Sequence, residues 1–263
     1  MADQFTILYI ADIIGKPGLD VIRMFLPSLL KSHSVDLCIA NGENGHNGIG
    51  LNESVARHYF DAGIDIITGG NHIWRHASYR EYLDTSDRVL RPLNYPDSAP
   101  GKGYLIHKTS RDIPVGVINL QGRTFMYTID CPFRTVETVI DRLKFTTKII
   151  IIDFHAEATA EKAALGWFLD GKVSAVIGSH THVQTADERI LPYGTAFITD
   201  AGMTGPHDSV IGMDIDTSIK RFITQIPEKY RMAFANNRLN GVVLQIDPDS
   251  GRTSSIKRIS LPE

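Results

Sequence analysis

Short apolar strands alternate with helical segments along this chain, and this alternation constrains its fold more than any other feature. Buried strands are predicted over residues 5–11, 35–40, 64–68, 148–153, 173–177 and 195–199. Helices are predicted over residues 19–30, 52–62, 135–145, 158–169 and 217–226, the second of them with Asn52 as its N-cap. Such alternation is typical of βαβ units, so we expect an α/β protein with a largely parallel sheet.

Two pairs of shorter strands interrupt this pattern. Residues 103–108 and 115–120 lie in a segment punctuated by Pro and Gly, and we expect them to pair in an antiparallel or mixed way. Residues 241–246 and 254–259 flank a turn at 247–251. No linker, change of composition or internal repeat divides the chain. We therefore expect a single domain over residues 1–263.

Composition excludes several classes of protein. A hydrophobic fraction of 43% is enough to build a core, and a net charge of −3 provides no basic field for duplex nucleic acid. The two cysteines, Cys38 and Cys131, are far apart and indicate a reducing compartment. No apolar run approaches the roughly 20 residues of a membrane span, and residues 1–4 lack the basic start of a signal peptide. These features predict a soluble cytoplasmic protein with no membrane partner.

Polar side chains that bind metals well follow five of the predicted strands. Because the carboxyl ends of strands in an open α/β sheet border the ligand crevice, we expect these side chains to converge. Their nitrogen and oxygen donors suit zinc, manganese or iron, and their number suits two ions bridged by a carboxylate. The residues are Asp12, Asn41, Glu43, Asn44, Asn71, His72, His155, His180 and His182.

Taken singly, several of these residues have ordinary structural explanations. Asp12 precedes a Gly/Pro turn and is typical of a turn or helix cap, and His155 alone is typical of a loop residue. Their occurrence after successive strands favours the metal site. The other histidines do not follow this pattern, although His46 and His207 lie in glycine-containing loops where both remain open as residues of the crevice.

The ordered motifs resemble those of the calcineurin-like metallophosphoesterases, and more closely the bacterial YmdB-like branch of that superfamily. The resemblance extends over about residues 7–246. It is carried by Asp12, Asn41-Gly-Glu43-Asn44, Gly70-Asn71-His72, Asp153-Phe-His155-Ala-Glu157 and Gly178-Ser-His180-Thr-His182. The resemblance implies a four-layer αββα sandwich of two mixed sheets, with a dinuclear metal centre at the strand ends.

Roles follow from the same resemblance. It assigns one ion to Asp12, Glu43, Asn44 and His182, and a second to Asn71, His155 and His180, with Glu43 bridging both. It makes His72 a general acid that binds no metal. The sequence departs from the superfamily at Ile14, where a His is usual, and at Arg75, which places a cation after the Asn-His motif. Arg75 and His207 are the candidates for substrate contacts.

The expected activity is metal-dependent hydrolysis of a phosphoric diester. A hydroxide bridging two first-row ions would attack phosphorus, and His72 would protonate the leaving group. Iron or manganese are the first candidates for the ions and zinc is the alternative. The resemblance suggests 2′,3′-cyclic nucleotides as substrates and a homo-oligomer as the assembly. Two alternatives stay open: a phosphomonoesterase or nucleotidase with the same centre, and a metal-binding regulatory protein that is catalytically weak.

Overall fold

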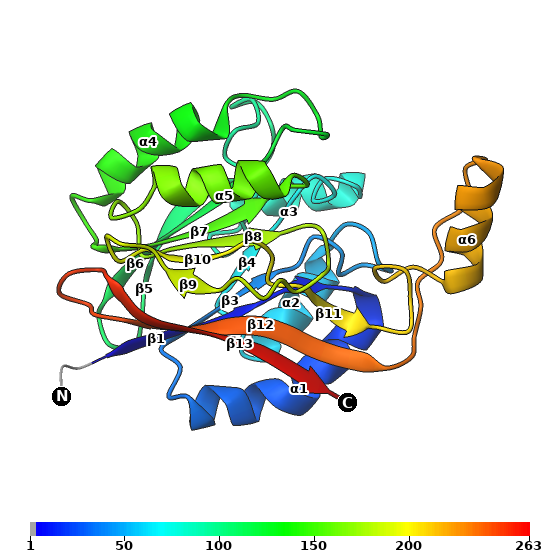
Figure 1. The fold of residues 1–263 in the computed structure, drawn as a ribbon, viewed down its shortest axis with the longest axis horizontal. Helices are drawn as coiled ribbons and strands as arrows, with labels where there is room; N and C mark the ends of the chain where they lie inside the picture. The colour runs from blue at the N-terminus through cyan, green and yellow to red at the C-terminus, as the bar shows by residue number, and fades with distance from the viewer. Residues whose placement is uncertain (1–3) are drawn as a thin grey trace.

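Two mixed β-sheets packed face to face form the centre of the computed structural model, which describes residues 4–263 (Figure 1). The first sheet has the order β2-β11-β12-β1-β3-β4, and β13 pairs with β12. Its strands are β1 (Phe5–Ile10), β2 (Asp12–Ile13), β3 (Leu37–Asn41), β4 (Ile66–Thr68), β11 (Met203–Pro206), β12 (Asn237–Ile246) and β13 (Thr253–Pro262). The second sheet has the order β5-β6-β7-β8-β10-β9. Its strands are β5 (Tyr104–Lys108), β6 (Pro114–Gln121), β7 (Ile149–His155), β8 (Ala175–Ser179), β9 (Arg189–Ile190) and β10 (Ala196–Ile198).

Each sheet combines a group of parallel strands with antiparallel neighbours. Strands β1, β3 and β4 are parallel, as are β6, β7, β8 and β10. Strand β12 runs antiparallel to β1, and β5 runs antiparallel to β6, as the sequence predicts for the latter pair. The parallel strands bring their carboxyl ends to one edge of each sheet, so polar residues that follow those strands meet there.

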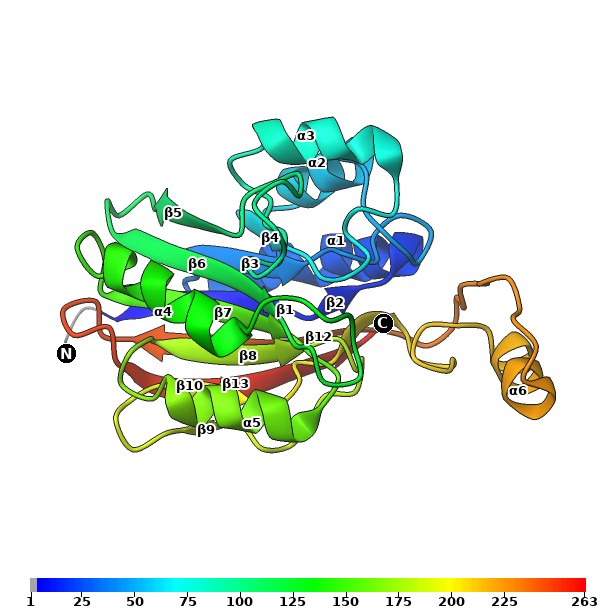
Figure 2. The ribbon, with the colours of Figure 1, turned by 90° about the horizontal axis from the view of Figure 1, so that it is seen from above.

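Helices cover the two outer faces of the sandwich, which lie above and below the sheets in Figure 1 and toward and away from the viewer in Figure 2. Residues of α1 (Gly15–Ser32), α2 (Glu53–Asp61) and α3 (Arg80–Thr85), the last preceded by a 3₁₀ turn (Ala77–Tyr79), pack on the first sheet. Helices α4 (Pro132–Leu143) and α5 (Thr159–Phe168) pack on the second, and α6 (Ile215–Thr224) stands away from both. The predicted four-layer αββα sandwich of two mixed sheets is therefore confirmed.

Alternation along the strands produces these layers. In β1, Ile7 and Tyr9 face the core between the sheets, whereas Leu8 and Ile10 face the helices. Local signals also act as expected, since Asn52 caps α2 by accepting a hydrogen bond from the backbone N–H of Val55 at 2.8 Å. The sequence analysis missed β2, β9, β11 and α3, because elements this short show no measurable periodicity.

The structure bears on two predictions about the cellular environment of the chain, one from its cysteines and one from its apolar segments. Both cysteines are free, with Cys38 buried in the core. In the range 4–263, no helix has the length and apolar character needed to cross a bilayer. The prediction about a signal peptide concerns residues 1–4, of which 1–3 lie outside the described part of the chain.

Replacing Ile151 by Ala tests the core between the sheets. Ile151 is fully buried there, so its truncation leaves a cavity and should lower the free energy of unfolding by about 2–5 kcal/mol. Ile106→Ala on β5 is the control, because 42% of that residue is already exposed. Urea denaturation measures both variants. Equal losses would contradict a core centred between the sheets.

Candidate functional site

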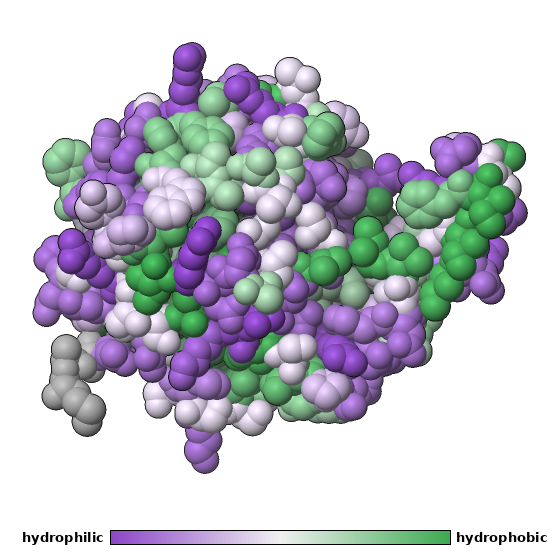
Figure 3. Space-filling view, viewed as in Figure 1, coloured by the Kyte–Doolittle hydropathy of each residue, from purple (hydrophilic) through white to green (hydrophobic). Residues whose placement is uncertain are grey.

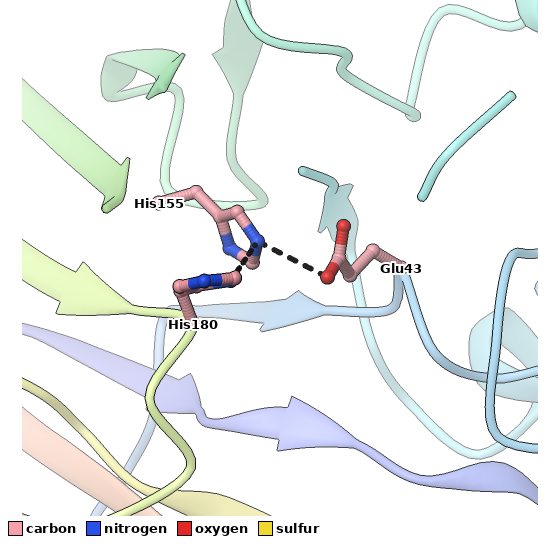
Figure 4. A group of neighbouring side chains, drawn as sticks. All are labelled: Glu43, His155 and His180. Atoms are coloured by element: carbon pink, nitrogen blue, oxygen red, sulfur yellow. Dashed lines mark hydrogen bonds and ion pairs between the residues drawn. The ribbon is translucent and has the colours of Figure 1, made fainter. Parts of the chain in front are cut away.

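Three side chains from distant parts of the chain meet at the carboxyl edge of the sheets (Figure 4). Glu43 follows β3, His155 ends β7 and His180 follows β8. His155 Nε2 lies 3.1 Å from Glu43 Oε1 and 3.1 Å from His180 Nδ1. One ligand atom from each residue lies within 4.8 Å of the other two, which is the spacing of a group that holds one metal ion.

A hydrogen-bonded relay fixes the ring of His155. The Ser179 hydroxyl donates to Asp153 Oδ1 at 2.6 Å, so the Ser179 oxygen is left to accept from His155 Nδ1–H at 3.0 Å. With its proton on Nδ1, the neutral imidazole presents a lone pair at Nε2. This is how a second layer of polar groups orients a metal-binding histidine.

Acceptor atoms surround His155 Nε2. The Glu157 carboxylate, 3.0 Å from His180 Nε2, keeps the proton of His180 on Nε2 and leaves its Nδ1 as an acceptor. Glu43 Oε1, His180 Nδ1 and Asn71 Oδ1 lie 3.1, 3.1 and 3.2 Å from it. Acceptor atoms at such distances repel one another unless a cation lies among them. The donor set therefore fits a metal ion that prefers mixed nitrogen and oxygen ligands.

The shifted pKa values of these residues also indicate that the site favours a positive charge. Burial favours neutral His155, yet the Glu43 carboxylate beside it outweighs burial and raises the pKa of His155 to about 9. Burial also raises the pKa of Glu43, but His155 and His72 outweigh it and hold this pKa well below the usual value. Burial and the charge of His155 lower the pKa of His180 to about 3. The pocket beside Glu43 thus favours one cation, either a proton or a metal.

A second group of donors lies next to the first. Asp12 is fully buried, and burial raises its pKa to about 7. Its Oδ1 has no hydrogen-bond partner within residues 4–263 and lies 3.9 Å from His182 Nε2 and from His155 Nδ1. An orphaned carboxylate oxygen at full burial is unfavourable unless a cation or water neutralises it.

His182 and Asn44 complete this second group. His182 donates its Nδ1–H to the carbonyl of Ile211 at 2.8 Å, so its Nε2 lone pair faces Asp12 and Asn44. The Asn44 amide directs Nδ2 at His182 at 3.3 Å and Oδ1 at His72 at 3.0 Å. It would present oxygen to an ion beside His182 after a half-turn of the amide.

A buried ion pair shapes the turn that carries both histidines. His180 and His182 have positive φ angles of 99° and 64°, a conformation that needs support from its surroundings. Asp200 provides it by accepting from the backbone N–H of Thr181 at 3.0 Å and from its hydroxyl at 2.7 Å. Lys162, itself 1% exposed, donates to the same carboxylate oxygen at 2.7 Å.

His72 lies beside these donors but is more exposed, with 36% of its side chain accessible. Its Nδ1 lies 3.0 Å from Asn44 Oδ1, and its backbone N–H donates to Glu43 Oε2 at 2.9 Å. No hydrogen bond engages its Nε2 in the described part of the chain. His72 is therefore held at one ring nitrogen and free at the other.

A cavity of about 460 Å³ opens above the site. Glu43, Asn44, His72, His180 and His182 line one side of it. The segment around α6 supplies most of the other lining residues, and these are mostly apolar. A concave site of this size, with a few convergent polar groups, is typical of small-molecule binding.

Two sequence candidates for substrate contacts lie elsewhere. Arg75 is exposed and does not line the cavity. His207 lines a neighbouring cavity, and its ring nitrogens face the carbonyl of Gly205 and the amide of Asn240 at 3.1 and 3.2 Å. His46, left open by the sequence, lies 2.7 Å from Asn52 through its Nδ1. All seven predicted metal ligands, by contrast, lie in one continuous cluster of contacts.

Sequence reasoning missed the residues that support this cluster. Asp153 carried a signal, because it follows four Ile residues in a buried strand, where a carboxylate needs partners. Asp200 directly follows a predicted strand, but nothing local marks Lys162 and Asp200 as a pair. Phe222 and Tyr230, which line the cavity, also lie outside every motif.

Several known proteins are similar to this chain in sequence and in fold. The chain matches the model of the YmdB-like proteins over residues 8–259. A 2′,3′-cyclic-nucleotide 2′-phosphodiesterase of Bacillus subtilis strain 168 is 46% identical over 253 residues, which are 96% of each chain. The crystal structure of a novel phosphatase from Mycoplasma pneumoniae superposes with a TM-score of 0.93 at 32% identity, covering 100% of this chain and 95% of that one. A hypothetical protein from Thermus thermophilus gives a TM-score of 0.92 at 37% identity, covering 98% and 100%.

Gly70→Ala tests whether the ligand atoms must converge. A Cβ atom at Gly70 would lie 2.3 Å from His155 Nε2 and 2.4 Å from Glu43 Oε2, so it would push these groups apart. We expect metal affinity to fall by about 10- to 100-fold, the range seen when ligand orientation is disturbed. Metal titration monitored by calorimetry measures this.

Gly69→Ala is the matched control, because the three atoms nearest to a Cβ atom there all belong to the side chain of Ile73, the first at 3.0 Å. Metal binding by Gly70→Ala equal to that of the control would contradict a site formed by Glu43 and His155.

Proposed function

The chain belongs to the YmdB-like family, and from this membership and the geometry of its site we propose that it hydrolyses nucleoside 2′,3′-cyclic phosphates with the help of two metal ions. It is an enzyme of the phosphoric diester hydrolase class. The observation that carries the proposal is the cluster of acceptors around His155 Nε2, which needs a cation at the edge of a cavity large enough for a nucleotide.

The two groups of donors would hold the two ions. Asn71, His155 and His180 would bind one, Asp12, Asn44 and His182 the other, and Glu43 would bridge them. Iron or manganese are the first candidates and zinc the alternative, since all three accept this ligand set. Bound there, the ions would lower the pKa of a water molecule toward 7 and neutralise phosphate oxygens.

A side chain of the protein would supply the proton that the leaving group needs. Attack by the oxygen of water forms a bond to phosphorus and breaks the bond from phosphorus to the 2′ oxygen. His72 is placed to protonate that departing oxygen, because its Nε2 has no hydrogen-bond partner in the described part of the chain and its Nδ1 faces the Asn44 amide. With that amide turned so that Oδ1 faces an ion, its Nδ2–H would donate to His72 Nδ1 and leave the ring proton on Nε2. The proton that the water loses reaches solvent, from which His72 is protonated again. The product is a nucleoside 3′-phosphate.

The site also explains how an acidic protein would accept an anion. Its net charge of −3 is distributed over the whole chain, whereas the bound metal ions would bring positive charge to the cavity, whose lining holds Arg221 beside the carboxylates of Glu43 and Glu157. We further propose that the chain acts as a single domain, because Asp12 near its start and His182 in its second half serve one site.

His72→Ala and Glu43→Gln should separate proton transfer from metal binding. Without His72 we expect kcat to fall about 10²- to 10⁴-fold while the metal content stays the same. Glu43→Gln should lower both kcat and the metal content, because it removes the negative charge that would be shared between the two groups of metal-binding residues. Elemental analysis and hydrolysis of adenosine 2′,3′-cyclic phosphate measure these effects. His58→Ala, exposed on α2, is the control.

Loss of metal-dependent hydrolysis in these variants, with the fold intact by circular dichroism, would refute the alternative of a catalytically weak regulatory protein. Unchanged hydrolysis in both variants would contradict the roles proposed for His72 and Glu43.

A comparison of two chromogenic substrates should separate a diesterase from a monoesterase. We expect bis-p-nitrophenyl phosphate to be hydrolysed faster than p-nitrophenyl phosphate, and we expect a chelator to abolish both reactions until metal is restored. Both substrates release the same leaving group, so they differ mainly in whether the phosphate is a diester or a monoester. A strong preference for the monoester would instead support the phosphatase alternative.

A further inference from the structure

A long excursion between β11 and β12, residues 207–236, carries α6 over the edge of the sandwich; we call it the arm. Its two ends are joined where the backbone N–H of His207 donates to the carbonyl of Asn236 at 3.0 Å. Farther out, Asp214 N–H donates to the carbonyl of Arg231 at 2.8 Å, so the arm has a paired neck. Figure 1 shows α6 at its tip, standing clear of the body.

The neck of the arm packs on the candidate metal site. The carbonyl of Ile211 accepts the Nδ1–H of His182 at 2.8 Å. The ring of Tyr230 lies against Gly48, where a Cβ atom would come within 2.5 Å of the ring and where φ is +85°. Gly48 belongs to the same loop as Glu43 and Asn44. The arm is thus anchored to two elements that carry candidate metal ligands.

The arm also supplies a wall of the cavity that the candidate ligands line. This wall consists of Val210, Ile211, Met213, Ser218, Arg221, Phe222 and Tyr230. Apolar side chains contribute nothing to the hydrolysis of a phosphodiester. We therefore expect this apolar wall to contact another part of the substrate. Phe222 is 70% exposed, and Figure 3 shows that apolar side chains gather along α6. A large ring exposed at the margin of a cavity is suited to cover a flat ligand group.

We propose that Phe222 and Tyr230 form the subsite for the nucleobase, so that the arm selects nucleotides from among cyclic phosphodiesters. This inference rests on the proposed function, since the reactive phosphate must lie at the candidate metal ligands that line the same cavity. Aromatic side chains stack on bases of any sequence, and each stacked base gains roughly fivefold to 150-fold in affinity.

Tyr230 also offers a polar contact. Its hydroxyl has no hydrogen-bond partner among residues 4–263. Burial raises the pKa of Tyr230 to about 12, so the hydroxyl keeps its proton at neutral pH and can donate to a base nitrogen or carbonyl oxygen. Phe222 would therefore contribute stacking, and Tyr230 both an apolar face and a donor.

The test compares two substrates that share the reactive group. Adenosine 2′,3′-cyclic phosphate carries a base, whereas the 2,3-cyclic phosphate of methyl riboside does not. With metal-loaded enzyme, Phe222→Ala should lower kcat/KM for the adenosine substrate by about tenfold or more and change it less than twofold for the base-free one. Phe222→Trp should restore the preference, because it restores an aromatic face.

Ile223→Ala is the matched control, since Ile223 neighbours Phe222 on α6, is 76% exposed and does not line the cavity. It should leave both substrates unaffected. A wild-type enzyme without preference between the two substrates, or a Phe222→Ala variant that loses equally on both, would overturn the subsite.

Binding of adenosine, measured by calorimetry, separates this inference from the proposed function. Adenosine lacks phosphate, so it reports on the base subsite alone. We expect it to bind the wild type and to bind Phe222→Ala more weakly. Absence of hydrolysis of either cyclic phosphate would contradict the proposed function, whereas absence of adenosine binding at millimolar concentration would contradict the subsite even if hydrolysis occurs.

Discussion

The buried carboxylate of Asp153 joins the two sheets directly beneath the candidate metal site. From the first sheet it accepts hydrogen bonds from the Tyr9 hydroxyl at 2.8 Å, the Asn41 amide at 3.0 Å and the Thr68 hydroxyl. From the second sheet it accepts the Ser179 hydroxyl at 2.6 Å. Burial raises its pKa, while these donors act in the opposite direction. Strands β1, β3, β4, β7 and β8 are thereby held together where their carboxyl ends meet, so the loops that follow them start from fixed positions.

An excess of acceptor atoms above this network gives the site its chemistry. Because Asp153 and Ser179 direct the proton of His155 to Nδ1, the other ring nitrogen turns its lone pair toward Glu43. Asp12 adds an oxygen with no partner among the described residues. Such an arrangement is unfavourable in a buried place unless positive charge is supplied. The same demand explains the raised pKa of His155 and supports metal ions as the natural occupants.

The sandwich carries the candidate metal ligands, and the arm carries the candidate subsite for the base. Strand ends place the donor atoms with little freedom, since their backbones belong to two paired sheets. The arm contacts this framework through Ile211 and Tyr230 and leaves α6 free at its tip. Reaction chemistry in our proposals therefore belongs to the rigid part of the molecule, and substrate selection to the part that a relative can change without disturbing the strands.

The amino-acid sequence by itself determined the α/β class, the cap of α2 at Asn52 and the kinds of donor that follow each parallel strand, because periodicity and capping act over a few residues. It also grouped the candidate ligands, since parallel strands end at one edge. Neither Arg75 nor His207 lines the cavity, and their role as substrate contacts stays a prediction. The sequence carried no sign of the Lys162–Asp200 pair or of Phe222 and Tyr230. Tertiary structure alone decided these, because contacts between residues far apart in the chain depend on how the sheets stack and where the arm returns, which no local pattern encodes.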